Sequence, residues 1–291
     1  MITEISFLLV IISSVIHPLW NMLLKKSEDK VIFYLNIHLF YTLAFCFILF
    51  LYPLKDVSIA GWVLVIVSAC THFFYQIFLC KTYEGADMSL SYPIIRSSPV
   101  FVLLMAFILL GEVPSKIAIL GIIVVMLGAY LINQKKISFS GILDPFRHIN
   151  KKVVFFAGLT AFSSACYSVV DKKGVLLMHP ILFFYLFFAL SGFLFLGYLL
   201  FMKERRRNYF YITKKDKFSI ALAAVLEFLS YILILYAFRM SKVAYVIALR
   251  QISVVFGSLY GILFLKEKYA KVRFAGAVII FIGIYLIAAF G

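Results

Sequence analysis

The stretch AILGIIVVMLGAYLI at residues 118–132 is repeated near the end of the chain as RFAGAVIIFIGIYLI at residues 273–287. Each copy holds two glycines seven residues apart and ends in the triplet Tyr-Leu-Ile. At the same offset of 155 residues, Glu112 before the first copy matches Glu267 before the second. Matched glycines and a matched acidic residue, in the same order, indicate an internal repeat.

The repeat continues toward the beginning of the chain at an offset of 150 residues. Two serines at residues 13–14 match two at residues 163–164, and Asn21 matches Asp171. The five-residue difference between the two offsets fits a longer loop between the seventh and eighth apolar stretches. We therefore expect two copies of one structural unit.

The composition is that of a membrane protein. The 291 residues are 64% hydrophobic and 14% charged, with a mean hydropathy of +1.05. A soluble domain is about 45–50% apolar and about 25% charged, so this chain would expose more apolar surface than it could bury. The net charge of +15 is explained by basic loops at a cytoplasmic face, and we expect no nucleic-acid partner.

Long apolar runs predict ten transmembrane helices, because one crossing takes about 20 residues. They are placed at residues 4–24, 31–52, 60–83, 87–110, 115–133, 153–172, 180–202, 216–239, 243–265 and 270–290. Since each half has an odd number of spans, the second half enters the membrane from the opposite side. The predicted fold is all-α, with two inverted five-helix repeats at residues 1–140 and 153–291 and a basic linker at 141–152.

Residues 83–132, and more faintly residues 240–287, resemble the conserved end of an EamA repeat. The most specific feature is a Gly-Glu pair ending at Glu112, followed by glycines nine and sixteen residues later. The second half departs from this pattern because it lacks the paired prolines Pro93 and Pro99. Over nearly its whole length the chain thus resembles the drug/metabolite transporter superfamily, EamA type. The resemblance implies a membrane carrier with a central cavity between the halves and leaves the substrate open.

The distribution of basic residues predicts the orientation. The loops on one face hold 20 lysines and arginines, whereas the opposite face holds 6. Since basic loops stay in the cytoplasm, we expect both termini to lie outside a plasma or inner membrane.

Two arginines stand inside the predicted spans, Arg96 in the fourth and Arg250 in the ninth. A charge at the bilayer centre costs at least about 2.5–3.5 kcal/mol, so such groups are candidates for function. The planar guanidinium binds a carboxylate or phosphate through two hydrogen bonds. We expect one or both arginines to bind an anionic substrate group, with Tyr92 on the same helical face as Arg96. The alternative is pairing with Glu227 or backbone carbonyls, or reaching to a headgroup.

Glu227 lies at the centre of the eighth predicted span and His72 at the centre of the third. Glu227 is a candidate to bind an ammonium group or to take up a proton, and His72 is a second candidate proton carrier. Gln76 and Tyr231, each one helical turn further on, extend the two polar stripes. The alternative is a single interhelical ion pair or hydrogen bond that fixes the packing.

Further substrate-binding candidates are Trp20 and Asn21 on the first span and Tyr167 on the sixth. His17 and Asp171 lie on the same spans. Glu112 and Glu267, at span ends, are interpreted as helix-capping or surface-pairing residues. The repeated glycines are interpreted as sites where helices approach closely.

The sequence has no phosphate-binding GxxxxGK[ST] loop, HExxH or GxSxG motif, and the four cysteines are scattered. We expect no enzyme activity, no cofactor and no metal. The favoured hypothesis is a secondary transporter of a small polar or amphipathic metabolite, such as an amino acid, with a proton as a candidate coupling ion. Its expected partners are that substrate and membrane lipids, as a monomer or homodimer. The alternatives are a flippase or enzyme acting on phosphate-bearing lipid-linked substrates, and a non-transporting scaffold.

Overall fold

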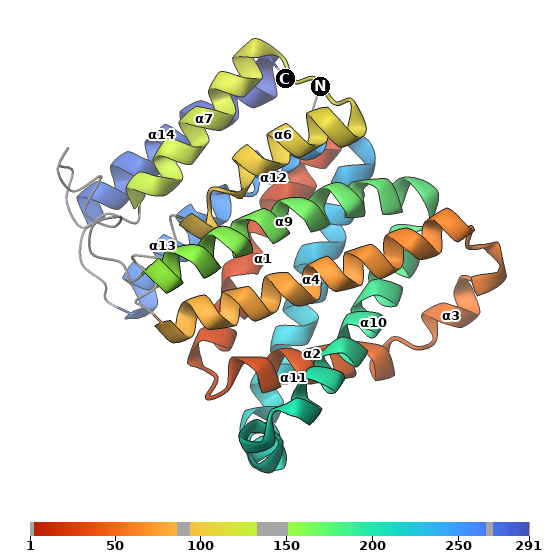
Figure 1. Ribbon diagram of the computed structural model, residues 1–291. Helices are drawn as coiled ribbons and strands as arrows, with labels where there is room; N and C mark the ends of the chain where they lie inside the picture. The colour runs from red at the N-terminus through yellow and green to blue at the C-terminus, as the bar shows by residue number, and fades with distance from the viewer. Residues whose placement is uncertain (1–2, 86–93, 133–150, 266–269, 291) are drawn as a thin grey trace.

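The computed structural model describes residues 3–85, 94–132, 151–265 and 270–290, and within these ranges it contains helices and no strands (Figure 1). Six helices are long and apolar enough to cross a membrane. They are α1 (Glu4–Lys26), α4 (Ile59–Gly85), α9 (Lys151–Leu177), α10 (Pro180–Phe201), α11 (Lys203–Met240) and α14 (Ala270–Phe290). Shorter apolar helices are α2 (Lys30–Ala44), α6 (Ser98–Leu110), α7 (Lys116–Ile132), and α12 (Val243–Leu249) followed by α13 (Ile252–Leu265).

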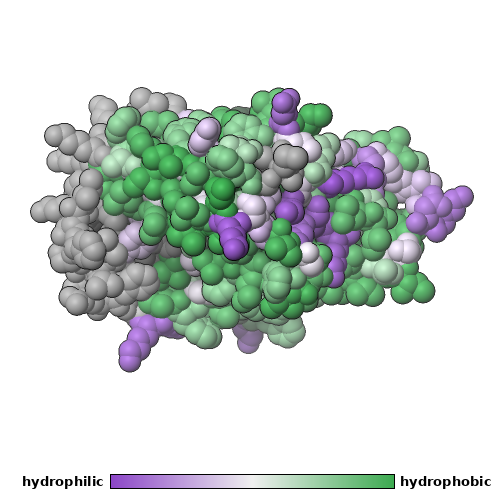
Figure 2. Space-filling view, turned by 90° about the horizontal axis from the view of Figure 1, so that it is seen from above, coloured by the Kyte–Doolittle hydropathy of each residue, from purple (hydrophilic) through white to green (hydrophobic). Residues whose placement is uncertain are grey.

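Large hydrophobic side chains cover much of the molecular surface, as Figure 2 shows for one face. Phe50, Ile59 and Phe107 are 87%, 85% and 55% exposed, although they lie on different parts of the bundle. A soluble monomer rarely exposes apolar patches of this extent. This surface fits the acyl chains of a bilayer.

The most extensive helix contacts join the first half of the chain to the second. Helix α4 packs along α9, α1 along α11, and α7 along α14; Figure 1 shows the first and last of these pairs side by side. Helix α2 packs against both α10 and α11. The core therefore lies between the two halves rather than within each of them. Both ends of the chain lie at the same end of the bundle (Figure 1).

Glycines bring α7 and α14 into backbone contact. A Cβ atom added to Gly121 would lie 2.8 Å from the carbonyl oxygen of Gly283, and one added to Gly128 would lie 2.7 Å from that of Gly276. Because the earlier glycine of one helix meets the later glycine of the other, the two helices run antiparallel. The prediction that the repeated glycines permit close helix approach is confirmed at these four positions.

A side chain at this contact is expected to destabilise the bundle. In Gly128→Val, the Cβ would meet both the Gly276 oxygen and the backbone nitrogen of Ile280 at 2.7 Å, so the helices must separate. We expect a loss of about 1–3 kcal/mol, the usual cost of overpacking, and hence a lower midpoint of thermal unfolding in detergent. Gly158→Val is the matched control, because no atom lies within 4 Å of a Cβ built there. Equal unfolding midpoints for the two variants would contradict this account of the contact.

The prediction of a loop before residue 216 is wrong. Residues from Lys203 onward are helical and continuous with the eighth predicted span, so α11 has 38 residues. At a rise of 1.5 Å per residue, α11 is about 57 Å long, well beyond the hydrocarbon thickness of about 30 Å. The basic first part is tied to the ends of other helices, because Arg205 pairs with Asp29 at 2.8 Å and with Glu84 at 2.5 Å. Lys, Arg and Glu are also good helix formers, and such a segment remains helical outside the membrane.

Two further spans differ from their predicted form. The second, predicted at residues 31–52, ends at Ala44 and is followed by the short α3 (Ile48–Leu51) and a 3₁₀ turn (Leu54–Asp56). The ninth, predicted at 243–265, is interrupted between α12 and α13. The position of this interruption matters for the site.

Candidate functional site

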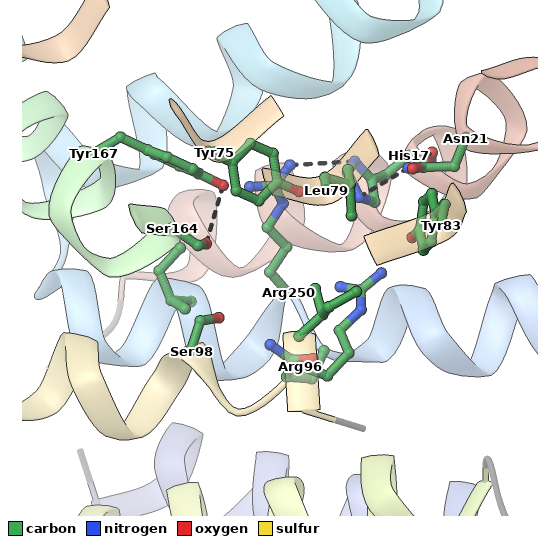
Figure 3. Close-up of a pocket in the computed structure, with 13 residues that line it drawn as sticks. His17, Asn21, Tyr75, Leu79, Tyr83, Arg96, Ser98, Ser164, Tyr167 and Arg250 are labelled. Carbon is green, nitrogen blue, oxygen red and sulfur yellow. Dashed lines mark hydrogen bonds between the residues drawn. The ribbon is translucent and has the colours of Figure 1, made fainter. Parts of the chain in front are cut away.

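A pocket that is open to the surface lies between the two halves (Figure 3); about 550 Å³ of space free of protein atoms, open solvent included, belongs to it. We call this pocket the cavity. Side chains of α1, α4 and the start of α6 form one part of its wall, and side chains of α9 and the α12–α13 junction form the other. The lining residues of α1 and α4 belong to the last parts of those helices. The cavity therefore lies toward the end of the bundle where α1 and α4 finish and α9 begins.

Both predicted arginines line this cavity, and each lies in a turn that directly precedes a helix. Arg96 and Ser97 form a turn immediately before α6, and Pro99 occupies the first turn of that helix, where its missing N–H has no cost. Arg250 caps α12, and Arg250 and Gln251 form the turn that precedes α13. The two turns fall at corresponding positions of the repeat, within one residue. Non-helical backbone inside an apolar bundle is tolerated where it is buried in protein or lines a cavity.

The two guanidinium groups reach into the same space from neighbouring helices (Figure 3). An Nη atom of Arg250 lies 3.2 Å from Nδ1 of His17, and its guanidinium carbon lies 5.4 Å from the ring centre of Tyr231. The Nε atom of Arg250 is buried without a hydrogen-bond partner. Arg96 donates to Oγ of Ser253 at 3.4 Å. Among the described residues that line the cavity there is no carboxylate, so its charge favours an anionic ligand.

Neutral polar groups complete the wall. Asn21 lies on the cavity and donates to the carbonyl oxygen of His17 at 2.9 Å. Tyr167 also lies on the wall, where its hydroxyl accepts a hydrogen bond from Ser164 at 3.1 Å. Trp20 does not line the cavity. Its indole Nε1 lies 3.2 Å from His17 Nδ1, so Trp20 supports the His17 ring that contacts Arg250. His17 therefore links the predicted residues of α1 to Arg250.

The remaining predicted residues lie behind the wall or outside the described residues. Gln76 and Glu227 are 2% and 6% exposed, and one oxygen of each has no hydrogen-bond partner. Neither lines the cavity, although Glu227 lies within electrostatic range of Arg250. Tyr92 falls outside the described residues.

A second polar cluster lies in the middle of the bundle and contains His72, Asp171, Tyr231 and Ser68. The carboxylate of Asp171 accepts hydrogen bonds from Ser68 Oγ at 2.6 Å and from the Tyr231 hydroxyl, and it lies 2.9 Å from His72 Nε2. The repeat relates His72 to Glu227, but the partner of His72 in the structure is Asp171. Because α4 packs along α9, the acid nearest to His72 comes from α9.

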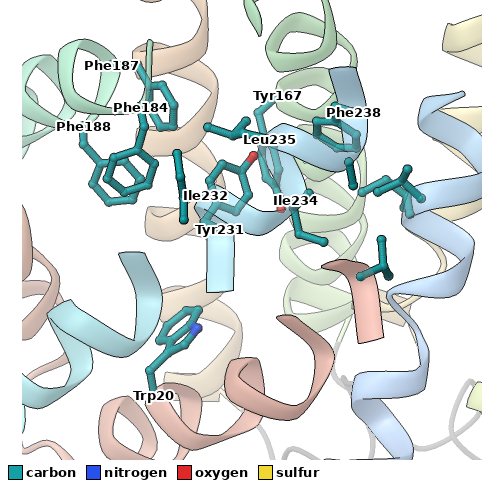
Figure 4. Close-up of a cluster of buried hydrophobic side chains, with 14 of the residues drawn as sticks. Trp20, Tyr167, Phe184, Phe187, Phe188, Tyr231, Ile232, Ile234, Leu235 and Phe238 are labelled. Carbon is teal, nitrogen blue, oxygen red and sulfur yellow. The ribbon is translucent and has the colours of Figure 1, made fainter. Parts of the chain in front are cut away.

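Aromatic rings pack against this cluster, and Figure 4 shows Tyr167, Phe184, Phe187 and Phe188 near its member Tyr231. The His72 ring stacks on Tyr167 and on Phe187, with centroid distances of 4.1 and 4.6 Å. Phe184 and Phe188 of α10 stack on each other with a centroid distance of 4.3 Å, and the Phe184 ring also contacts the Tyr231 ring. These rings exclude water, so the polar groups of the cluster depend on one another for hydrogen bonds.

At the opposite end of the bundle, contacts around Glu112 join the two halves. Helix α6 ends at Gly111, whose φ of 65° is left-handed, and the Glu112 carboxylate accepts a hydrogen bond at 2.9 Å from the N–H of Val243, the first residue of α12. Lys172 of α9 lies 4.0 Å away, and Lys242 donates to the carbonyl oxygen of Val113 at 2.8 Å. Burial raises the pKa of the Glu112 carboxyl, although Lys172 and the Val243 N–H oppose this. The predicted capping role of Glu112 is confirmed; Glu267 lies outside the described residues.

Comparison with known proteins gives a family and a fold. The model of the EamA-like transporter family matches residues 4–134 and 151–289. Twenty-nine chains of solved structures match, among them a crystal structure described only as that of a protein. It has a TM-score of 0.70 and 13% sequence identity, and the match covers 99% of this chain and 97% of that one. Since the identity is so low, the likeness shows the fold alone. No curated protein matches the chain.

Proposed function

The chain belongs to the EamA-like transporter family, and from this premise we propose that it is a secondary transporter working by alternating access. The family match makes it a multi-pass membrane protein that carries small solutes. The proposed solute is a small polar metabolite with a carboxylate or phosphate group, amino acids among the candidates. The absence of a phosphate-binding loop from the sequence favours a solute or ion gradient over ATP as the driving force.

We assign the six long and four shorter apolar helices to ten crossings in two inverted repeats. The helix contacts support this. The repeat relates α1 to α9 and α4 to α11, so exchanging the halves turns the α1–α11 contact into the α9–α4 contact, and both are observed. The antiparallel pair α7 and α14 supports it further: exchange of the halves converts the Gly121–Gly283 contact into the Gly276–Gly128 contact. In this arrangement the two repeats occupy residues 1–140 and 153–291.

The observation that carries the proposal is the position of Arg96 and Arg250. Both line one cavity between the halves, both lie in turns directly before a helix, and the cavity has no acidic lining residue among those described. Two permanent charges in an apolar bundle are costly, and an anion bound between them would offset that cost. Two guanidinium groups also provide the planar donor pairs that suit carboxylate and phosphate.

The proposed orientation places the basic loops in the cytoplasm and both termini outside. With this orientation the cavity faces the cytoplasm, because it lies toward the end where α1 and α4 finish. The contacts around Glu112 then close the outer side. Transport requires these contacts to break while the cytoplasmic end closes.

Uptake into liposomes containing the purified protein tests the proposal. The probes are L-glutamate, succinate, inorganic phosphate, L-leucine and L-lysine, each compared with protein-free liposomes. We expect at least one of the three anionic probes to enter faster, and the cationic L-lysine to remain at the background rate. Preferential entry of L-lysine would overturn the anion assignment. Scrambling of a fluorescent anionic phospholipid without uptake of any probe would favour a flippase instead.

A further inference from the structure

We propose that His72 and Asp171 form a proton-carrying site, and that a proton and the anionic substrate bind together and cross the membrane together. This inference rests on the proposed transport function. It adds the coupling ion, the residues that carry it and the direction of coupling. None of the residues of the cluster lines the cavity.

The geometry isolates a titratable pair from water. Asp171 is fully buried and His72 is 5% exposed. Ser68 and Tyr231 donate to the Asp171 carboxylate, which His72 Nε2 also contacts at 2.9 Å. The Asp171 carboxylate therefore has three polar partners, and the only basic one is the His72 imidazole. In the proposed site this imidazole is the group that carries the proton.

Protonation changes the net charge of the pair. With the imidazolium form of His72, the pair with Asp171 is neutral overall, whereas with neutral His72 it carries one buried negative charge. Such a charge is unfavourable in an apolar bundle unless a nearby cation compensates it. In the proposed cycle, water reaches the His72 ring only when the helices around it rearrange during transport. An O–H bond of hydronium then breaks as the N–H bond of the imidazolium forms, and the reverse step returns the proton to water.

Two aromatic side chains connect this pair to the cavity. The Tyr167 ring stacks on His72 at 4.1 Å while the same residue lines the cavity wall. Tyr231 donates its hydroxyl hydrogen to Asp171, and its ring centre lies 5.4 Å from the Arg250 guanidinium. The pair is therefore one side chain behind the wall.

This arrangement fixes the sign of coupling. The positive charge of Arg250 stabilises the negatively charged, proton-free pair. An anion bound to Arg250 cancels part of that positive charge and so favours protonation of His72. By thermodynamic reciprocity, protonation of His72 strengthens anion binding by the same factor. Proton and anion therefore bind together, which is cotransport and not exchange.

Few other titratable groups face the pair from the helices around it. Helix α10 presents the apolar rings of Phe187 and Phe188. Among the described residues, the titratable side chains that contact the pair or its surrounding rings are Tyr167 on α9, Tyr231 on α11, and His38 on α2, which stacks on Phe188 at 4.7 Å. Arg250, after α12, lies beside the Tyr231 ring, and Glu227 on α11 lies within electrostatic range of Arg250. Lys172 follows Asp171 but belongs to the contacts around Glu112. Arg250 is the neighbour through which an anion in the cavity would act.

The variant Asp171→Asn separates coupling from binding. An asparagine beside a neutral imidazole has no net charge at any pH at which His72 is neutral, so it imitates the proton-loaded pair. Such a protein should bind and exchange the substrate but fail to use a proton gradient. With L-glutamate as probe, two assays are compared in liposomes: accumulation driven by an inward proton gradient, and counterflow at equal pH on both sides.

We expect the wild-type protein to perform both reactions. Asp171→Asn should lose gradient-driven accumulation by about tenfold or more, within the usual range of coupling, and retain counterflow. His179→Gln is the matched control, a half-buried histidine before α10 that contacts Tyr52 and Tyr236 near the Glu112 end of the bundle, and it should retain both reactions. If Asp171→Asn does not fold, Tyr231→Phe decides the question, because it removes one donor to Asp171 and keeps the ring; its ratio of accumulation to counterflow should fall.

Three results would overturn the inference while leaving transport itself standing. The first is wild-type uptake that does not depend on the pH gradient, and the second is accumulation driven by an outward proton gradient. The third is full gradient-driven accumulation by Asp171→Asn or, where that variant does not fold, by Tyr231→Phe. If the wild-type protein transports L-glutamate in neither assay, succinate and then inorganic phosphate replace it. If none of the three is transported, the proposed function falls and this inference falls with it.

Discussion

Replacing Arg250 by alanine is expected to raise the half-saturating concentration of the transported anion by about 10- to 100-fold, since a hydrogen bond to a charged group contributes about 1.5–3 kcal/mol. Arg250 lines the cavity, its Nε atom has no partner, and the His17 ring holds its guanidinium from the side. The truncated protein keeps the cavity but loses one of its two positive charges. The measurement is the concentration dependence of initial uptake into liposomes.

Three further variants sharpen this result. Arg96→Ala should show an effect of similar size, because Arg96 lines the same cavity. Arg250→Lys should fall between wild type and alanine, since lysine keeps the charge but lacks the planar pair of donors. Arg239→Ala is the matched control, an exposed arginine in the last turn of α11. Unchanged half-saturation in both Arg96→Ala and Arg250→Ala would exclude the cavity as the binding site.

Sequence patterns were sufficient to find the two arginines, since a charge within an apolar run is visible without coordinates. The turn at Arg96 also had a signal, because Pro99 follows it within three residues. The break at Arg250 had none: residues 243–256 contain neither proline nor glycine. An apolar run records the length of a segment in lipid, but not whether its helix is continuous.

The sequence could not predict which acidic residue contacts His72 in the buried cluster. The repeat related His72 to Glu227, and symmetry-related residues face each other only when they lie close to the twofold axis. The helix contacts pair α4 with α9 instead, which brings Asp171 to His72. The sequence also did not reveal that residues 203–215 are helical, because the contacts of Arg205 with Asp29 and Glu84 join distant segments. In both cases the missing information is tertiary.

Cross-linking the ends of α6 and α12 that meet near Glu112 is expected to abolish net transport. The change is Val113→Cys together with Lys242→Cys, in a protein whose four natural cysteines are replaced; the Lys242 side chain contacts the Val113 carbonyl oxygen at 2.8 Å. A short bifunctional thiol reagent then joins the two halves at the end that must open. Because alternating access requires both ends to open in turn, uptake should fall at least about tenfold and recover when a reducible linker is cleaved. Uptake of the preferred anionic probe is measured before and after cleavage.

The control for this experiment joins two residues of the same half at the same end of the bundle. His179 lies directly before α10 and Tyr236 lies on α11, and the Tyr236 hydroxyl oxygen is 3.5 Å from His179 Nε2. A link between cysteines at these two positions leaves the two halves free to move. The doubly substituted control should therefore keep its uptake after cross-linking, as should the single-cysteine proteins treated with the same reagent. Continued transport with α6 fixed to α12 would contradict opening at the Glu112 end. The loss of transport only with the link between the halves would place the moving boundary between α6 and α12, where Glu112 now bonds the first N–H of α12.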